Sequence, residues 1–188
     1  DRQGVLADLD PATLRGTLLA VPVVNVFGLV RESRYLPDGR DLNRSFPGAA
    51  HGSLAARLAA LFLEEIVARC SFGVDLHSGT NDRRNLPHLR ADLADEGTRA
   101  RAMAFGAPVV LDGKDRPGSL RTVAKERGCS ILVFEGGEAL RFDPEGVAVG
   151  HRGVLRVLAA EGMIEPRVEP AIDLPTIPNR PTWIRARR

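Results

Sequence analysis

Apolar residues in this chain gather in short, nearly unbroken runs. The longest run covers residues 17–26 (TLLAVPVVNV), and further runs cover residues 72–76, 107–111 and 130–134. Unbroken runs of this length are typical of strands buried on both faces, as in a parallel sheet. Pro22 lacks the N–H that a central strand donates, so it counts against a central strand or marks a bulge or strand end in the first run.

Between these runs, apolar positions follow a helical period. The clearest helix covers residues 53–69 and has Ser53 as its N-cap. Its predicted buried face consists of Leu54, Leu58, Leu61, Phe62 and Ile66. Further helices are predicted over residues 94–105, 119–127 and 143–161.

The alternation of strands and helices predicts an α/β fold, with an open, mixed but mostly parallel sheet flanked by helices. Residues 27–50 and 78–87 are expected to be loops. In such sheets, ligands bind at the carboxyl ends of the strands. Asn25, His77 and Glu135 each stand at the end of a predicted strand, so this edge of the sheet is the expected site.

Composition narrows the class of protein. The 188 residues, 44% of them hydrophobic, suffice for one α/β domain. A net charge of +2 and the lack of a basic motif with interleaved aromatics give no support for nucleic-acid binding. No apolar run approaches the length of a membrane span. Cys70 and Cys129 form no C-x-x-C pair, so a reducing cytoplasm is the expected location.

The segment D-L-N-R-S-F-P-G at residues 41–48 is the strongest candidate for a ligand-binding loop. It places Asn43 beside Arg44, and Arg34 lies a few residues upstream. A guanidinium matches a carboxylate with two parallel hydrogen bonds, and an amide adds a further donor. The loop therefore predicts a clamp for a small acid, with a solvated basic loop as the alternative.

Two other places could carry chemistry. Asp75 and His77 share one face of a strand, so the carboxylate can orient the imidazole, although a structural, hydrogen-bonded histidine fits the pattern as well. Glu135 ends an apolar run and precedes two glycines. A carboxylate half out of water suits a general base, and a strand-end glutamate paired with an arginine is the alternative.

Three segments in this order resemble one known family. They are S-R-Y with D-L-N-R-S-F-P-G, then V-D-L-H-S-G-T, then L-V-F-E-G-G. Together they are similar to the succinylglutamate desuccinylase/aspartoacylase family, a branch of the zinc carboxypeptidase-like fold. The segments R-G-T-L-L-A-V-P-V-V-N, R-N-L-P-H-L-R-A-D and R-P-T-W-I-R-A extend the resemblance over nearly the whole chain.

The resemblance implies zinc-dependent hydrolysis of an N-acyl amino acid. His77 would be a zinc ligand, with Asp75 behind it, and Glu135 would be the general base. Arg34, Asn43 and Arg44 would hold the substrate carboxylate. Zinc would lower the pKa of its bound water towards about 7 and polarise the acyl oxygen.

The chain departs from the family pattern at both ends. The H-x-x-E segment that supplies two zinc ligands is absent, because no histidine precedes His51. We therefore expect residues 1–165 to be the central part of a catalytic domain, and residues 166–188 to be a linker and the start of a truncated C-terminal β domain. A zinc-free module that binds small carboxylates and a carboxypeptidase-like peptidase are the alternative functions.

Overall fold

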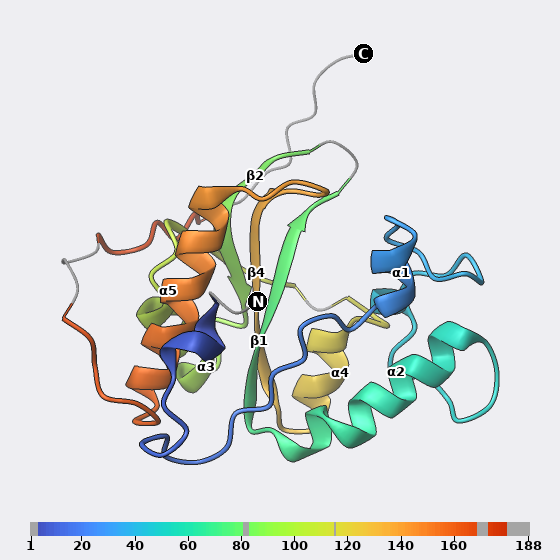
Figure 1. Ribbon diagram of the computed structural model, residues 1–188, viewed down its shortest axis with the longest axis horizontal. Helices are drawn as coiled ribbons and strands as arrows, with labels where there is room; N and C mark the ends of the chain where they lie inside the picture. Colours follow the sequence, from blue (N-terminus) through green and yellow to red (C-terminus); the bar gives the residue numbers. More distant parts are fainter. Residues whose placement is uncertain (1–3, 81–82, 115, 169–172, 180–188) are drawn as a thin grey trace.

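The computed structural model describes residues 4–80, 83–114, 116–168 and 173–179, and it shows an open, mixed sheet between two layers of helices (Figure 1). The sheet order is β1-β4-β2-β3. The strands are β1 (Phe72–Gly79), β2 (Asn85–Ala91), β3 (Val109–Asp112) and β4 (Ser130–Glu138). β1 runs parallel to β4 and β2 parallel to β3, whereas β2 and β4 are antiparallel. The predicted fold class is confirmed.

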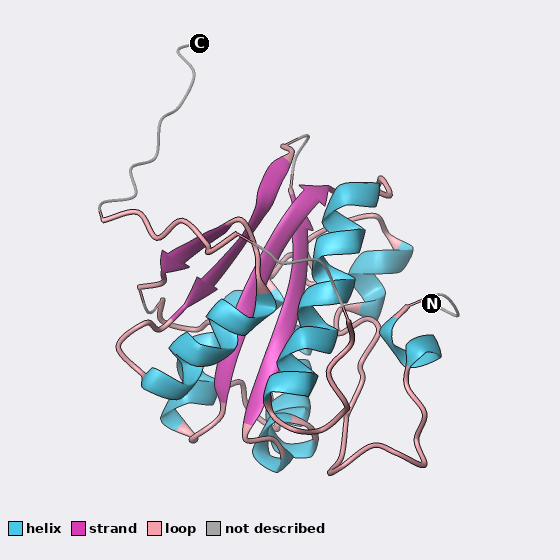
Figure 2. Cartoon of the chain, turned by 90° about the vertical axis from the view of Figure 1, so that its left-hand side faces the viewer, coloured by secondary structure: helices cyan, strands magenta, loops and turns pink. Residues whose placement is uncertain are grey.

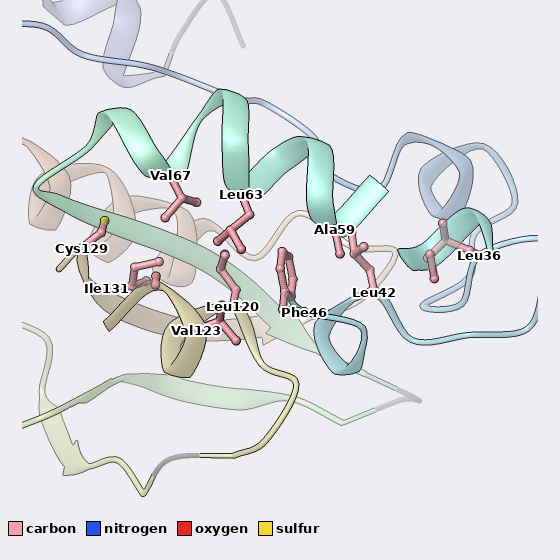
Figure 3. Packing of buried hydrophobic residues seen from close by; sticks show 12 residues of the cluster. Leu36, Leu42, Phe46, Ala59, Leu63, Val67, Leu120, Val123, Cys129 and Ile131 are labelled. Atoms are coloured by element: carbon pink, nitrogen blue, oxygen red, sulfur yellow. The ribbon is translucent and has the colours of Figure 1, made fainter. Parts of the chain in front are cut away.

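Each face of the sheet carries its own hydrophobic cluster. On one face, α2 (Leu54–Glu65) and α4 (Leu120–Glu126) pack against Ile131 of β4, as Figure 3 shows. On the other face, α3 (Glu96–Phe105) and α5 (Pro144–Ala160) cover Leu132 and Phe134, the face seen in Figure 2. Alternate residues of β4 thus enter opposite clusters, as the period of a strand buried on both faces requires.

The remaining helical elements are short. They are α1 (Val26–Val30) and the 3-10 turns η1 (Val5–Asp8), η2 (Leu42–Arg44) and η3 (Val67–Arg69). The prediction of a loop over residues 27–50 is wrong in part, because α1 extends into the start of this range and η2 lies within it. η2 sits inside the D-L-N-R-S-F-P-G segment and fixes the backbone of the predicted clamp.

Side chains at the helix starts explain why the helices begin where they do. Ser53, Ser119 and Asp143 are N-caps that accept hydrogen bonds from backbone N–H groups of α2, α4 and α5. Each cap satisfies N–H groups that the helix itself leaves unpaired. Asp95 caps α3 in the same way. Ser53 was predicted as the N-cap of α2, and this prediction is confirmed. The predicted start of the helix at Asp143 also agrees with α5.

The buried face of α2 agrees with the predicted one only in part. Ala55, Ala59 and Leu63 are fully buried, whereas Leu61, which was predicted to be buried, is 58% exposed. The small residues matter because a Cβ placed on Gly48 would lie 2.2 Å from the carbonyl oxygen of Ala56. The loop approaches the helix closely, so alanines lie where it passes. Leu63 is buried as well, and Leu54, Leu58 and Phe62 are partly buried against the same cluster.

The prediction of a buried strand at residues 17–26 is wrong. Among the described residues this segment belongs to no sheet, and Leu19 and Val21 are 41% and 39% exposed. Asn25 therefore does not end a strand. It precedes a helix instead, and its side chain caps α1 by accepting from the N–H of Gly28 at 2.9 Å. An apolar run becomes a strand only where an edge offers hydrogen bonds, and Pro22 removes one donor from this run.

The prediction of a loop at residues 78–87 is wrong at both ends, because β1 continues to Gly79 and β2 begins at Asn85. The whole of β2 was missed. Its polar His88 and Arg90 alternate with the buried Leu89 and Ala91. This pattern belongs to a strand that is apolar on one face only.

Beyond α5 the chain returns to the sheet. Thr176 forms an isolated parallel bridge with Val109, and its N–H donates to the carbonyl oxygen of Pro108 at 3.0 Å. Part of the predicted linker therefore extends the β3 edge. Within the described residues, no helix combines the length and apolarity needed to cross a bilayer.

Candidate active site

The site is built on the central strand pair. β1 and β4 run in parallel register, and His77 stands beside Glu135. His77 and Glu135 therefore lie next to each other on neighbouring strands, because residues in register on adjacent strands point to the same face of a sheet. Asp75, two residues before His77, lies on that same face. The sequence prediction that these strand residues converge is confirmed.

Asp75 and His77 are in direct contact. The Nε2 of His77 lies 2.8 Å from the Oδ2 of Asp75, and both side chains are largely buried. A carboxylate at this distance fixes the orientation of the ring and the nitrogen that carries the proton. The Nδ1 atom of His77 is left for another partner.

Opposing effects act on the pKa of His77. Burial, the largest single influence, lowers this pKa because it disfavours the charged ring. The hydrogen bond and charge of Asp75, together with the charge of Glu135, outweigh burial and raise the pKa overall. The positive charge of Arg34 acts in the opposite direction. Both Glu135 and Arg34 are therefore close enough to influence the imidazole.

Glu135 is held by a residue that the sequence did not single out. The side-chain amide of Asn85 on β2 donates to the Oε2 of Glu135 at 3.0 Å. The partner is an amide on a neighbouring strand, whereas the alternative considered from the sequence was an arginine. Asn85 lies in the R-N-L-P-H-L-R-A-D segment, whose resemblance to the family was a signal that could have pointed to it.

Arg34 is held in place by an acidic neighbour. Its Nε and Nη2 both lie 2.9 Å from the Oδ2 of Asp41. Asp41 also accepts from the N–H of Asn43 at 2.9 Å through its other carboxylate oxygen. One carboxylate thus orders both the guanidinium and the η2 turn. The side chain of Arg34 remains about one-third exposed, at 34%.

Asn43 and Arg44 have different surroundings. The Oδ1 of Asn43 accepts a hydrogen bond from the N–H of Leu120, the first residue of α4, at 2.8 Å. Its NH2 group still has donors for a ligand. Arg44 is exposed, and its guanidinium bends back to donate to the carbonyl oxygen of Asn43. Asn43 therefore has a structural role that the sequence did not reveal, and the binding roles of Arg34, Asn43 and Arg44 stay predictions.

The described residues do not form a complete zinc site. None of their histidines, cysteines and acidic residues cluster in a group of three or more that could hold a metal ion. A catalytic zinc needs three protein ligands. His77, which Asp75 orients, could supply one of these three ligands.

Comparison with known proteins identifies the family. Residues 3–160 match the model of the succinylglutamate desuccinylase/aspartoacylase catalytic domain. The chain is 29% identical over 160 residues to the N-alpha-acetyl-L-2,4-diaminobutyric acid deacetylase of Halomonas elongata, which covers 81% of this chain and 47% of that protein.

Solved structures agree with this match. A succinylglutamate desuccinylase/aspartoacylase from Rhodobacter sphaeroides is 31% identical, with a TM-score of 0.76, over 86% of this chain and 51% of that chain. The product-bound ectoine utilization protein EutE (DoeB) from Ruegeria pomeroyi is 25% identical, with a TM-score of 0.81, over 92% and 55%. The chain spans about half the length of these relatives. It belongs to the succinylglutamate desuccinylase/aspartoacylase family.

Proposed function

We propose that the protein containing this chain hydrolyses the amide bond of an N-acyl amino acid. The observation that carries the proposal is the register of β1 and β4, which sets the Asp75–His77 pair beside Glu135. Family membership and the similarity to a deacetylase of an N-acetyl amino acid support it. The acyl group and the amino acid are left open by this proposal.

In the proposed reaction, Glu135 is the general base. One oxygen of its carboxylate accepts a proton from the attacking water, and the water oxygen forms a bond to the acyl carbon. Glu135 then gives the proton to the leaving nitrogen as the C–N bond breaks, which releases a carboxylic acid and an amino acid. A positioned general base contributes about 10²- to 10⁴-fold to such a reaction.

The loop residues would bind the substrate. The guanidinium of Arg34, which Asp41 holds, acts on His77 through its charge, and Asn43 offers the donors of its amide group. Arg34 and Arg44 are exposed, and Asn43 is partly buried. A substrate carboxylate held by these groups would place its acyl nitrogen near the central strands. Positioning of this kind lowers the barrier by making the reacting groups neighbours in advance.

We also propose that the whole enzyme uses one zinc ion, with His77 as the ligand from this part of the chain. The remaining ligands would have to come from outside the described residues. Metal analysis of the natural protein tests this directly. We expect about one zinc per chain, and loss of zinc in a His77→Ala variant. A metal-free protein with full activity would contradict the proposal.

The cysteines support a reducing cytoplasm as the location. Cys70 and Cys129 are both free thiols, and burial raises the pKa of Cys129 to about 11. A thiol with so high a pKa carries little reactive thiolate. We propose neither a nucleic-acid partner nor a membrane partner.

The proposed function is tested by assaying the natural protein against N-acetyl and N-succinyl amino acids, starting with Nα-acetyl-L-2,4-diaminobutyric acid. A dipeptide with a free carboxyl end tests for peptidase activity. We expect amide hydrolysis of an N-acyl amino acid, and a Glu135→Gln variant with kcat lower by about 10²-fold or more. Unchanged kcat in that variant would rule out Glu135 as the base. Hydrolysis of the dipeptide alone would favour a peptidase.

A further inference from the structure

Asn85 on β2 contacts the proposed base, Glu135, from the side opposite to His77. β4 lies between β1 and β2, so Glu135 has His77 on one flank and β2 on the other. The amide of Asn85 donates to Oε2 of Glu135 at 3.0 Å. Both residues are partly buried, so water competes less well for this hydrogen bond than it would at the surface.

An irregularity in β2 turns Asn85 towards Glu135. In the antiparallel register His88 faces Glu135 and Asn85 faces Gly137, so three residue steps on β2 match two on β4. In a regular strand, Asn85 and His88 would point to opposite faces. The extra residue shifts the alternation and brings Asn85 to the face of Glu135. Bulges of this kind re-aim side chains beside active sites.

Arg84, the residue before Asn85, holds the start of β2 on the face of the sheet opposite to Glu135. The guanidinium of Arg84 donates from Nε to Asp143 at 2.9 Å and from Nη2 to Glu145 at 3.0 Å. Asp143 is the N-cap of α5. Arg84 therefore ties the beginning of β2 to the helix layer, while Asn85 reaches the site from the other face of the same strand.

The backbone of β4 is equally constrained at this level. Gly137 has φ +68, and a Cβ placed there would lie 2.7 Å from the Cβ of Asp143. Only glycine fits such a conformation and approach without strain. Asp143 thus lies close to Gly137 of β4 and bonds to Arg84, the residue directly before β2.

We infer that Asn85 is a positioning residue for Glu135, an inference that rests on the proposed function. The hydrogen bond occupies Oε2 and leaves Oε1 to accept the proton from water. A glutamate side chain has three rotatable bonds, so without this bond its carboxylate samples several orientations. A small misplacement of a reacting group costs about 10²-fold in rate.

The test uses the natural protein and its best substrate from the panel of N-acyl amino acids. Asn85→Ala should lower kcat about 10- to 100-fold with little change in KM, because the base and not the binding loop is affected. Asn85→Gln, which keeps the donor, should recover part of that loss. Asn85→Asp should have a kcat at most equal to that of Asn85→Ala, because two carboxylates would then face each other.

The control variant is Asn179→Ala. It makes the same chemical change at an exposed bend, and its kcat and KM should match those of the parent protein.

The outcomes separate this inference from the proposed function. If Glu135→Gln abolishes turnover while Asn85→Ala keeps kcat within about twofold, the role of Asn85 is overturned and the base assignment stands. An equal loss in all three Asn85 variants, including Asn85→Gln, would indicate a structural role and overturn the inference. Crystal structures give a test without activity. In Asn85→Ala the Glu135 carboxylate should take a different orientation from the one in the parent protein. An unchanged orientation would contradict the positioning role of Asn85.

Discussion

The two halves of the candidate site are held in different ways. Asp75, His77 and Glu135 project from β1 and β4, where the hydrogen bonds of the ladder fix their spacing. Arg34 and Asn43 stand in the chain between α1 and α2, where individual side-chain contacts hold them. The geometry of the strand half is fixed by the backbone ladder, and the loop half carries its positive charge on long side chains held by single contacts.

This difference suggests a division of labour. Proton transfer needs atoms placed to a fraction of an ångström, which a strand provides. Binding a carboxylate tolerates adjustment, because a long guanidinium side chain can follow its partner. We therefore expect changes on the strands to act mainly on kcat, and changes in the loop to act mainly on KM or on stability.

Among the changes that leave Glu135 in place, one of the largest effects should come from Asp75. Asp75→Asn keeps the shape of the side chain but removes the charge that orients His77 and raises its pKa. We expect kcat/KM of the natural protein to fall by about 10- to 100-fold, as for other carboxylates that support a histidine in a site. Steady-state kinetics measure this loss. An Asp75→Asn enzyme as active as its parent would show that the pair is only structural.

A smaller effect is expected in the loop, at Arg34. Arg34→Lys keeps the charge but loses the planar fork that Arg34 now shares with Asp41. Loss of one charge-assisted hydrogen bond to the substrate should raise KM about tenfold and leave kcat within about threefold. A fall in kcat at constant KM would place Arg34 in the chemical step and would undo the division between strands and loop.

The smallest effect concerns stability, at Asn43. Asn43→Ala removes the acceptor for the N–H of Leu120 and should lower the free energy of unfolding by about 1 kcal/mol. Asn43→Asp keeps that acceptor, so thermal denaturation should match the parent protein. The added negative charge should nevertheless raise KM for an acidic substrate. Equal KM values for Asn43→Asp and the parent would remove Asn43 from the substrate site.

The sequence was sufficient for the parts of the fold that local pattern determines. β4 followed from an unbroken apolar run, the start of α2 from the capping residue Ser53, and the start of α5 from the predicted helix over residues 143–161. The pairing of His77 with Glu135 followed from the rule that the carboxyl ends of parallel strands meet at one edge.

The parts that failed depend on partners distant in the sequence. Residues 17–26 are as apolar as β4, yet the described chain offers them no strand to pair with. Asn85 reaches Glu135 only because of the irregular register between β2 and β4. The contact of Asn43 with Leu120 joins residues 77 positions apart. Neither local composition nor periodicity carries information of this kind.

The central claim is that β1 and β4 carry the chemistry of an N-acyl amino acid hydrolase whose loop binds the substrate. The most direct measurement is kcat and KM for Glu135→Gln and Arg34→Lys, side by side, on the best substrate of the natural protein. We predict that Glu135→Gln lowers kcat by about 10²-fold or more with KM little changed. We predict that Arg34→Lys raises KM about tenfold and leaves kcat within about threefold. A Glu135→Gln enzyme that turns over at the parental rate would contradict the account.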